Sequence, residues 1–295
     1  MENTTANYRQ VKKIKDDKFD IESLDRYNLS IQLAENDFQL CISDSKTNNC
    51  LLLEDYILND SQSIDALIAT LSQLFENHHV LHAGFWNSVK FSIKNVKFTL
   101  VPESLFDKDN LAAYLKLSCE INVDEEKIHY YKHIKTEAVA VFSASKKFTD
   151  WLFSLYPNST VHVIHQGNAL IEGVLNYDDH NENRSMYIFT DRSHVSIIIT
   201  RNRQLELYNK FAYNTTMEYF RYVANAFQLY DMDQNRSKVI VWGSITKDSA
   251  LFKELYKHFR HVSFGTKPDF LNYNYMFDEA DDHQYFDLYN TFLCE

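Results

Sequence analysis

Glycine is scarce in this sequence. Its 295 residues include five glycines, against a usual share of about 7%. They are Gly84, Gly167, Gly173, Gly243 and Gly265. No two lie near enough to form a glycine-rich loop, so neither a P-loop nor a dinucleotide-binding fingerprint is present. A GxSxG nucleophile elbow is missing as well, so the sequence lacks the common motifs of phosphate binding and serine hydrolysis.

Cysteine and long apolar runs are also in short supply. The four cysteines, Cys41, Cys50, Cys119 and Cys294, form no CxxC pair, which fits a reducing compartment better than a disulfide framework. No apolar run approaches the ~18 residues that a membrane span needs. The polar N-terminus has no apolar core of a signal peptide. The sequence therefore predicts a cytoplasmic protein without a transmembrane segment.

Positive charge is outnumbered. The formal net charge is −11, whereas nucleic-acid binding depends on lysine and arginine that displace phosphate counterions, so no nucleic-acid partner is expected. The one basic cluster, Lys12, Lys13 and Lys15, is followed at once by Asp16 and Asp17. We interpret residues 1–23 as a polar, solvated tail. Peripheral contact with an anionic membrane surface is the alternative.

Apolar and aromatic residues are plentiful. They make up 45% and 15% of the chain, enough for a large packed core. The length fits two domains of roughly 100–200 residues each.

The first half of the pattern contains strands with period-two alternation and helices with a 3.6-residue stripe. Its expected elements are strands at 27–33, 38–42 and 50–58, a helix at 64–75, a strand at 138–142, a helix at 148–155, a strand at 161–164 and a helix at 169–175. An insertion at 76–136 interrupts this order. It includes a hairpin that turns at Lys94-Asn95.

The second half repeats the order after a polar stretch at 178–184. Its expected elements are strands at 186–189, 195–199 and 205–211, a helix from 215, a strand at 239–242, a helix at 251–259, a strand at 261–264 and a C-terminal helix at 282–293. The aromatic stretch at 270–277 lies outside these elements. We interpret it as core packing, with a cover over an interlobe cleft or a partner surface as alternatives.

Both halves thus follow one plan: strand, strand, strand, helix, strand, helix, strand, helix. Three antiparallel strands followed by parallel crossovers predict, in each half, a mixed five-stranded sheet with helices on both faces. The expected fold is a duplicated α/β protein. Its first lobe spans 24–177, with the insertion at 76–136, and its second lobe spans 178–295.

The duplicated plan resembles the actin-like ATPase superfamily, whose sheets are of the ribonuclease H type. A more specific resemblance is carried by three segments, Phe98–Phe106 (FTLVPESLF), Leu207–Phe211 (LYNKF) and His283–Tyr289 (HQYFDLY). They are similar to DUF3822, a family of Bacteroidota proteins that has no established activity to carry over. The similarity runs from about Tyr27 to the C-terminus.

The superfamily resemblance implies three nucleotide-binding loops, where glycine or small residues let backbone amides approach phosphates. The corresponding loops of this sequence are Ala34-Glu35-Asn36-Asp37, Thr190-Asp191-Arg192-Ser193 and Trp242-Gly243-Ser244. The first two contain no glycine, and the first places carboxylates where a polyphosphate would lie. Asp191 with Mg²⁺ and Arg192 with phosphate would suit a nucleotide, but both residues also suit an ordinary polar turn.

Metal and nuclease chemistry find little support. Histidines recur at short spacing, as in His129 and His133 or His162 and His165, but no cysteine accompanies them and no HExxH motif is present. A ribonuclease H-like nuclease would need several converging carboxylates. Asp37 and Asp191 are conceivable members, although no carboxylate lies within the first strand of either half.

The sequence therefore favours a non-catalytic, actin-like scaffold or protein-interaction module, with an unidentified protein partner, no catalytic residue and no metal site. Its degenerate nucleotide-loop positions are Asn36, Asp37, Asp191, Ser193 and Gly243. The alternative is a divergent nucleotide-binding protein or ATPase that holds ATP and Mg²⁺ between the lobes. A nuclease is the third hypothesis.

Overall fold

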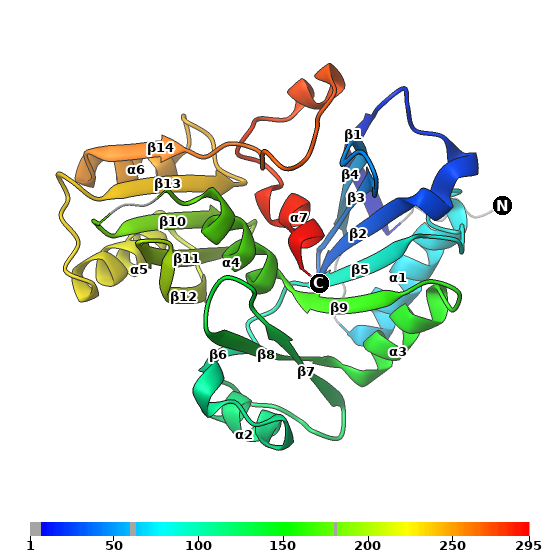
Figure 1. The fold of residues 1–295 in the computed structure, drawn as a ribbon, viewed down its shortest axis with the longest axis horizontal. Helices are drawn as coiled ribbons and strands as arrows, with labels where there is room; N and C mark the ends of the chain where they lie inside the picture. The colour runs from blue at the N-terminus through cyan, green and yellow to red at the C-terminus, as the bar shows by residue number, and fades with distance from the viewer. Residues whose placement is uncertain (1–6, 60–62, 180–181, 295) are drawn as a thin grey trace.

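The structure, a computed structural model, describes residues 7–59, 63–179 and 182–294. In this part of the chain the strands form three sheets (Figure 1). The two larger sheets stand side by side, and a short C-terminal helix lies between them (Figure 1). This is the mixed α/β architecture of two lobes that the repeated pattern predicts.

The first large sheet has the strand order β1-β4-β3-β2-β5-β9. Its strands are β1 (Tyr8–Lys15), β2 (Tyr27–Ala34), β3 (Asp37–Asp44), β4 (Cys50–Leu58), β5 (Ser88–Ile93) and β9 (Val161–His165). Strand β2 is antiparallel to β3 and parallel to β5. With helices α1 (Ile64–Asn77) and α3 (Lys146–Leu155) on one face, this sheet forms the first lobe.

The N-terminal segment corrects a prediction, because this sheet has six strands and not five. Residues 8–15, expected to be part of a solvated tail, pair with β4 in an antiparallel ladder. Only Ile14 and the residue after the strand, Asp16, are buried, while Lys13 and Lys15 are exposed and Lys12 is partly exposed. Lysine on an edge strand protects the open ladder from further pairing, so a basic sequence is compatible with a strand here.

The second large sheet has five strands in the order β12-β11-β10-β13-β14. They are β10 (Ser185–Thr190), β11 (His194–Arg201), β12 (Gln204–Ala212), β13 (Lys238–Gly243) and β14 (His261–Phe264). The first three are antiparallel, and β13 and β14 add on in parallel. Together with α5 (Thr216–Leu229) and α6 (Ala250–His258) on one face, this sheet forms the second lobe.

The third sheet shows that the insertion begins later than predicted. It has the order β6-β8-β7, with β6 (Phe98–Pro102), β7 (Glu126–Lys132) and β8 (Ala138–Ser145). Residues 138–142, expected in the first lobe's main sheet, belong to this small sheet. The place predicted for residues 138–142 in the main sheet is taken by β5, whose Val89 and Phe91 pack in the first lobe's core. Lys94-Asn95 therefore lies in the connection from β5 of the main sheet to β6 of the small sheet and does not form the predicted hairpin turn.

Short helices complete the small sheet. They are η2 (Glu103–Leu105), η3 (Lys108–Asn110) and α2 (Leu111–Lys116). Another short helix, η1 (Ile21–Arg26), precedes β2 in the large sheet. Leu115 of α2 packs with Val101 and Val141 in a small apolar cluster of its own.

Helix α4 (Gln166–Tyr177) joins the two lobes. It follows β9 of the first lobe, yet its Leu170, Ile171 and Val174 pack on Tyr187 and Trp242 of the second sheet. Every residue from 166 to 175 is buried. An apolar helix without an exposed face is expected where packing surrounds it. The helix thus fixes the position of one lobe against the other.

A connecting segment, residues 265–285, runs from β14 back to the first lobe and contains η4 (Tyr275–Glu279). Its Asn272 amide donates to the Asn48 carbonyl (2.8 Å), and the Cys50 amide donates to the Asn272 carbonyl (2.9 Å). Leu271 and Phe277 pack on β4. The aromatic stretch at 270–277 therefore does contribute to a core, on the first lobe.

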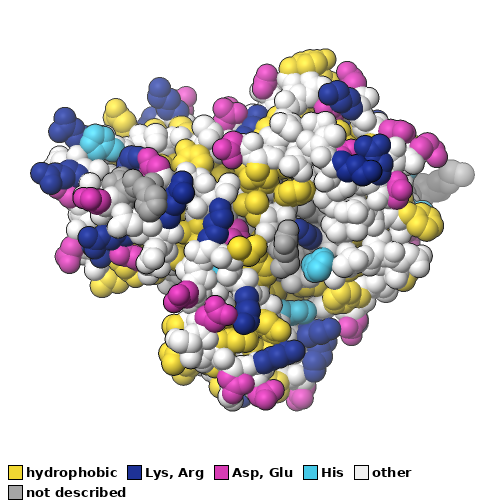
Figure 2. Space-filling model, in the orientation of Figure 1, with side chains coloured by type: hydrophobic (Ala, Val, Ile, Leu, Met, Phe, Trp, Pro, Cys, Tyr) yellow, Lys and Arg dark blue, Asp and Glu magenta, His cyan; other side chains and the backbone are white. Residues whose placement is uncertain are grey.

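The C-terminal helix is shorter than the predicted 282–293. It consists of α7 (Phe286–Asn290) and η5 (Thr291–Leu293), because Tyr285 has a φ of 57° and cannot continue a right-handed helix. Helix α7 is fully buried between the lobes. None of the described helices is both long enough and apolar enough to cross a membrane. Figure 2 shows acidic and basic side chains interspersed over one face of the molecule.

Candidate functional site in the interlobe cleft

The candidate site lies where strands of both lobes end. The parallel neighbours β2 and β5, and likewise β10 and β13, have their carboxyl ends at the cleft. In α/β sheets this edge is the usual place for a ligand. The side chains directly beyond these strands are Lys94 after β5 and Asp191 after β10, and Asp37 begins β3 beside them.

Lys94 is at the centre of this site. Its ammonium Nζ lies 2.6 Å from Asp37 Oδ2, 3.6 Å from Asp191 Oδ2 and 3.9 Å from Asp287 Oδ2. The ammonium also donates to Gln39 Oε1 at 3.2 Å. Its side chain is only 3% exposed. A buried charge is tolerated only when it is paired, and here three carboxylates from three separate elements compensate it.

The electrostatics keep this lysine charged. Burial alone would lower the pKa of Lys94, but the carboxylates of Asp191, Asp37 and Asp287 raise it above its usual value. Burial likewise opposes ionisation of Asp191, yet Lys94 and Lys210 hold its pKa well below the ordinary range. Asp287 differs, since burial and the neighbouring Asp191 charge raise its pKa. Burial raises the pKa of Asp37 in the same way, so the cluster contains one firmly ionised carboxylate, Asp191, and two that take up a proton more easily.

Arg192 adds a second connection between the lobes. From the turn after β10 it donates to the carboxylate of Asp37 and forms a two-pronged contact with Asp55 of β4, at 3.0 and 3.1 Å. The hydroxyl of Tyr285 donates to the same Asp55 (3.1 Å). Both Asp55 contacts come from Nη2 of Arg192, whereas Nη1 donates to Asp37, and hydrogen bonds between charged groups are stronger than neutral ones. The second lobe is therefore held to β3 and β4 of the first.

Amide side chains extend the network toward α4. The Gln166 amide donates to Asp287 Oδ2 (2.7 Å) and to Asp191 Oδ2 (3.1 Å). Its carbonyl oxygen accepts from Lys210 Nζ (2.7 Å), and Gln32 of β2 also donates to Asp287. Burial lowers the pKa of Lys210 to about 8. Side chains of both lobes are therefore used in internal contacts, although Gln32 Oε1 accepts no hydrogen bond from a described residue.

The structure brings together some of the residues that the sequence singles out. Asp37 and Asp191 meet at Lys94. Asn36 and Ser193 are exposed and take no part: the Asn36 carbonyl accepts from the Leu58 amide, and the Ser193 hydroxyl contacts His194.

Gly243, the third predicted loop position, is required for a different reason. Its φ is +94°, and a Cβ would lie 2.1 Å from the Thr190 carbonyl oxygen, so only glycine fits at the end of β13. Its amide already donates to the carbonyl of His283 (2.8 Å). This glycine serves close packing of backbone segments, and its N–H is not free for a phosphate.

Sequence reasoning missed the two residues that complete the site. Lys94 follows the alternating apolar run of β5, where the pattern predicts a hairpin turn, whereas Asp287 lies within an apolar C-terminal helix. A charge next to an apolar run is a signal for a buried ion pair, although the sequence does not say which partner it meets.

A cavity of about 450 Å³ remains at the mouth of the cleft. Five acidic and three basic side chains line it: Asp55, Asp191, Glu279, Asp281 and Asp287 against Lys12, Lys94 and Arg192. An acidic lining opposes a polyphosphate, because like charges in a poorly solvated site repel strongly. Within the described ranges, no three His, Cys, Asp or Glu side chains form a group that could hold a metal ion.

The fold has well-matched relatives among solved structures. A protein of Bacteroides thetaiotaomicron VPI-5482, described as having an actin-like ATPase fold and unknown function, is 21% identical, with a TM-score of 0.78 over 94% of this chain and 99% of that one. The PilM-PilN type IV pilus biogenesis complex gives a TM-score of 0.62 at 9% identity, over 90% of this chain and 97% of that one. At these identities the likeness concerns the fold.

A comparison with curated proteins found no match. A model of one protein family, described as "Protein of unknown function (DUF3822)", matches residues 16–262. This range includes β2 to β13 of the large sheets, with Lys94 and Asp191 of the cleft. The chain therefore belongs to the DUF3822 family and has the actin-like ATPase fold.

Proposed function

We propose that this protein is a non-catalytic member of the actin-like fold that acts as a protein-interaction scaffold. The observation that carries the proposal is the position of Lys94, whose ammonium lies among the carboxylates of Asp37, Asp191 and Asp287 at the carboxyl ends of the strands. The ammonium and its partners occupy the part of the cleft where ATP-binding relatives are expected to hold a nucleotide and its metal.

The size of the charge–charge interactions in the cleft supports the proposal of a non-catalytic protein. Two unit charges 4 Å apart interact by about 4 kcal/mol at an effective dielectric constant of 20. A triphosphate that entered the cleft without an added cation would be repelled by the carboxylates of Asp191 and Asp287. A metal ion would be repelled by the ammonium of Lys94. Either ligand has to displace an existing internal partner. The charged side chains of the site thus already compensate one another.

Ion pairs and hydrogen bonds around the cleft also hold the two lobes together. Arg192 joins the second lobe to Asp37 and Asp55, and Asn272 of the connecting segment joins it to β4 through backbone hydrogen bonds. A nucleotide cycle would need the lobes to open and close. A fixed arrangement suits a protein that presents one constant surface to a partner. The PilM-PilN complex, whose fold this chain shares, is an assembly with a second protein.

Titration with nucleotide tests the proposal. A ligand at 100 times its Kd stabilises a protein by about 2.7 kcal/mol, which for a chain of this size raises Tm by roughly 5 °C or more. We expect millimolar Mg-ATP to leave Tm unchanged relative to Mg²⁺ alone, and isothermal titration calorimetry to show no saturable heat. A saturable, Mg-dependent shift with ATP would contradict the proposal.

A divergent nucleotide-binding protein is the second candidate. The cavity of about 450 Å³ favours it, because Gly243, Ser244 and Thr246 line this space on the second lobe. In that case Mg-ATP would raise Tm, and replacing the exposed Thr246 by valine would reduce the effect. The exposed Thr47→Val, outside the cavity, is the matched control.

A further inference from the structure

The cavity at the mouth of the cleft has polar groups that no internal contact uses. At about 450 Å³ it has the size of a ligand pocket, and it is lined by residues of β1, β3, β4, the loop after β13 and the connecting segment. Its inner charges are taken up by the ion network, since Asp55 and Asp191 both accept from Arg192. The groups left for a ligand therefore lie around that network.

Gln39 of β3 offers a hydrogen-bond donor to the cavity. Its Oε1 accepts from Lys94 Nζ (3.2 Å), which fixes the orientation of the amide. The residue is 8% exposed, yet Nε2 donates to no described residue and keeps some accessible surface. Because Gln39 lines the cavity and buried polar groups are nearly always paired, this N–H group calls for an acceptor from outside the chain.

Two carboxylates that line the same cavity have no ion pair among the described residues. They belong to Glu279 and Asp281 of the connecting segment, and both residues are exposed. The next acid, Asp282, differs, because Lys267 Nζ pairs with it (3.2 Å) and also donates to the Phe277 carbonyl (2.7 Å). The internal cation of this segment is therefore used elsewhere, and Glu279 and Asp281 remain for a ligand.

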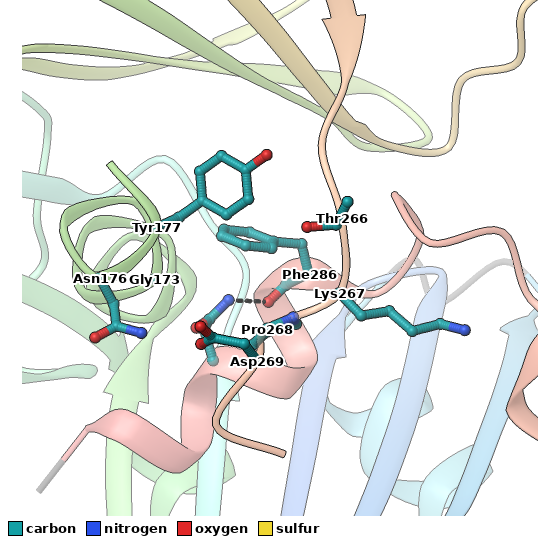
Figure 3. Close-up of a pocket in the computed structure, with 9 residues that line it drawn as sticks. Gly173, Asn176, Tyr177, Thr266, Lys267, Pro268, Asp269 and Phe286 are labelled. Atoms are coloured by element: carbon teal, nitrogen blue, oxygen red, sulfur yellow. Dashed lines mark hydrogen bonds between the residues drawn. The ribbon is translucent and has the colours of Figure 1, made fainter. Parts of the chain in front are cut away.

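A smaller pocket of about 180 Å³ lies between α4, α7 and the start of the connecting segment, and the Lys267 side chain extends away from it (Figure 3). Its Phe286 ring is 1% exposed and stacks on Trp242, and its Asn290 is also 1% exposed. These side chains are closed to a ligand. The larger cavity is therefore the better site for a partner.

The charges of the larger cavity favour a basic ligand. Its lining also includes Lys12 of β1, but the Nζ of Lys12 already donates to the Glu279 carbonyl (3.0 Å). The net charge of −11 attracts a basic partner at long range. A peptide segment with a basic side chain supplies both missing partners, a carbonyl acceptor for Gln39 and a cation for the carboxylates.

We propose that this cavity receives a short basic segment of a partner protein, with a backbone carbonyl on Gln39 Nε2 and a basic side chain at Glu279 and Asp281. The volume corresponds to about fifteen groups of ~30 Å³, which suits one arginine with its two peptide groups. This inference rests on the proposed role as an interaction module and names the chemistry of its partner.

Titration with a blocked peptide tests the need for a cation. We expect N-acetyl-Gly-Arg-Gly-amide to bind in the millimolar range by protein-observed NMR and to shift the signals of Ser244 and Thr246, which line the cavity. The same peptide with citrulline, a neutral isostere of arginine, should bind about fivefold more weakly. Equal binding of the two peptides would overturn the proposal.

Single acid variants locate the cation. Glu279→Gln and Asp281→Asn should each weaken binding of the arginine peptide about threefold. Asp278→Asn is the matched control, because Asp278 is an exposed acid of the same η4 that does not line the cavity, and it should leave the affinity unchanged. A control variant as weak as Glu279→Gln would show attraction by overall charge alone and overturn the site.

Gln39→Glu tests the carbonyl contact, because it keeps an acceptor for Lys94 and removes the Nε2 donor. The variant should keep the Tm of the wild type and bind the arginine peptide about fivefold more weakly. Stronger peptide binding by Gln39→Glu, or tighter binding of spermidine than of the peptide to the wild type, would indicate a site for a bare cation and overturn the peptide assignment. Failure of these tests leaves the Mg-ATP result, and with it the scaffold proposal, unaffected.

Discussion

Lys94 and Asp191 connect the two lobes through their charges: Nζ of Lys94, directly after β5, lies 3.6 Å from Oδ2 of Asp191, directly after β10. Both residues lie at carboxyl ends of strands, where sheets of this class receive ligands. Unlike a bound metal, an ammonium that belongs to the chain does not dissociate. Charge compensation in the cleft is therefore permanent, and several consequences can be measured.

Replacing Lys94 by methionine removes the central cation from a buried cluster of carboxylates. Losing one partner of a buried ion pair costs about 3–5 kcal/mol, so the free energy of unfolding should fall by that amount at pH 7. Asp37 and Asp287 have raised pKa values in the native protein, chiefly because of burial. Without Lys94 these pKa values rise further, so the folded variant binds more protons than its unfolded chain and the loss should shrink as pH falls from 7 to 5.

Urea denaturation of both proteins at the two pH values measures this effect. Lys97→Met is a suitable control, because Lys97 is 38% exposed and pairs with Glu126 near the surface. That change should cost less than about 1 kcal/mol. A Lys94→Met variant within about 1 kcal/mol of the wild type would show that the network contributes little.

Replacing Lys94 by alanine should open a cation site. The change leaves the carboxylates of Asp37, Asp191 and Asp287 with a space between them that a lysine side chain filled. Oxygen ligands of this kind suit Mg²⁺ and Mn²⁺, and the three carboxylates, which among the described residues form no metal-binding group as they stand, would move toward the vacated space to hold such an ion. Millimolar Mn²⁺ should therefore raise the Tm of Lys94→Ala by several degrees and leave the wild type unchanged. Lys94→Ala combined with Asp287→Asn should lose most of this response; an equal response would place the ion elsewhere.

The sequence indicates the lobes because each strand and helix carries its own apolar pattern. It also points to Asp37 and Asp191, since each lies in a polar turn next to a buried strand. It does not indicate Lys94 or Asp287, because their role depends on the packing of α7 between sheets that are distant in the chain. Long-range packing of this kind leaves no local period.

Two wrong predictions have a common physical cause. Residues 8–15 form an edge strand with one buried apolar residue, Ile14, so their pattern is that of a polar tail. Residues 138–142 form a buried apolar strand, which is equally compatible with the main sheet and with the small one. Patterns show which residues are buried, but they do not show against which sheet.

Glu54 should make stability fall in acid. It lies fully buried on β4, where burial opposes ionisation but His78 (2.7 Å), Lys13 (2.8 Å) and the Tyr56 hydroxyl lower its pKa to about 2. Because the folded pKa is below the unfolded value of 4.5, the stabilisation is present above pH 4.5 and is lost as pH falls toward 2. A shift of this size corresponds to about 3 kcal/mol.

The comparison with Glu54→Gln isolates this group. Urea denaturation from pH 7 to pH 2.5 should show that the wild type loses about 2–3 kcal/mol more than the variant. Parallel curves for the two proteins would assign the acid sensitivity to other carboxylates.

Gly173 is where α4 and α7 come closest. A Cβ on this residue would lie 2.4 Å from Cγ of Asn290, whose amide is fully buried against the α4 backbone. Gly173→Ala should therefore push α7 away from α4 and destabilise the protein by about 1–3 kcal/mol, the usual cost of overpacking. Gly84→Ala provides a matched control, since nothing lies within 4 Å of its added Cβ and the change should be neutral or slightly stabilising. Both variants can be compared by urea denaturation.

Because α7 also carries Asp287, Gly173→Ala should in addition perturb the NMR signals of Lys94 and Gln166. Unchanged signals of these two residues in a destabilised variant would show that helix packing and the ion network are independent.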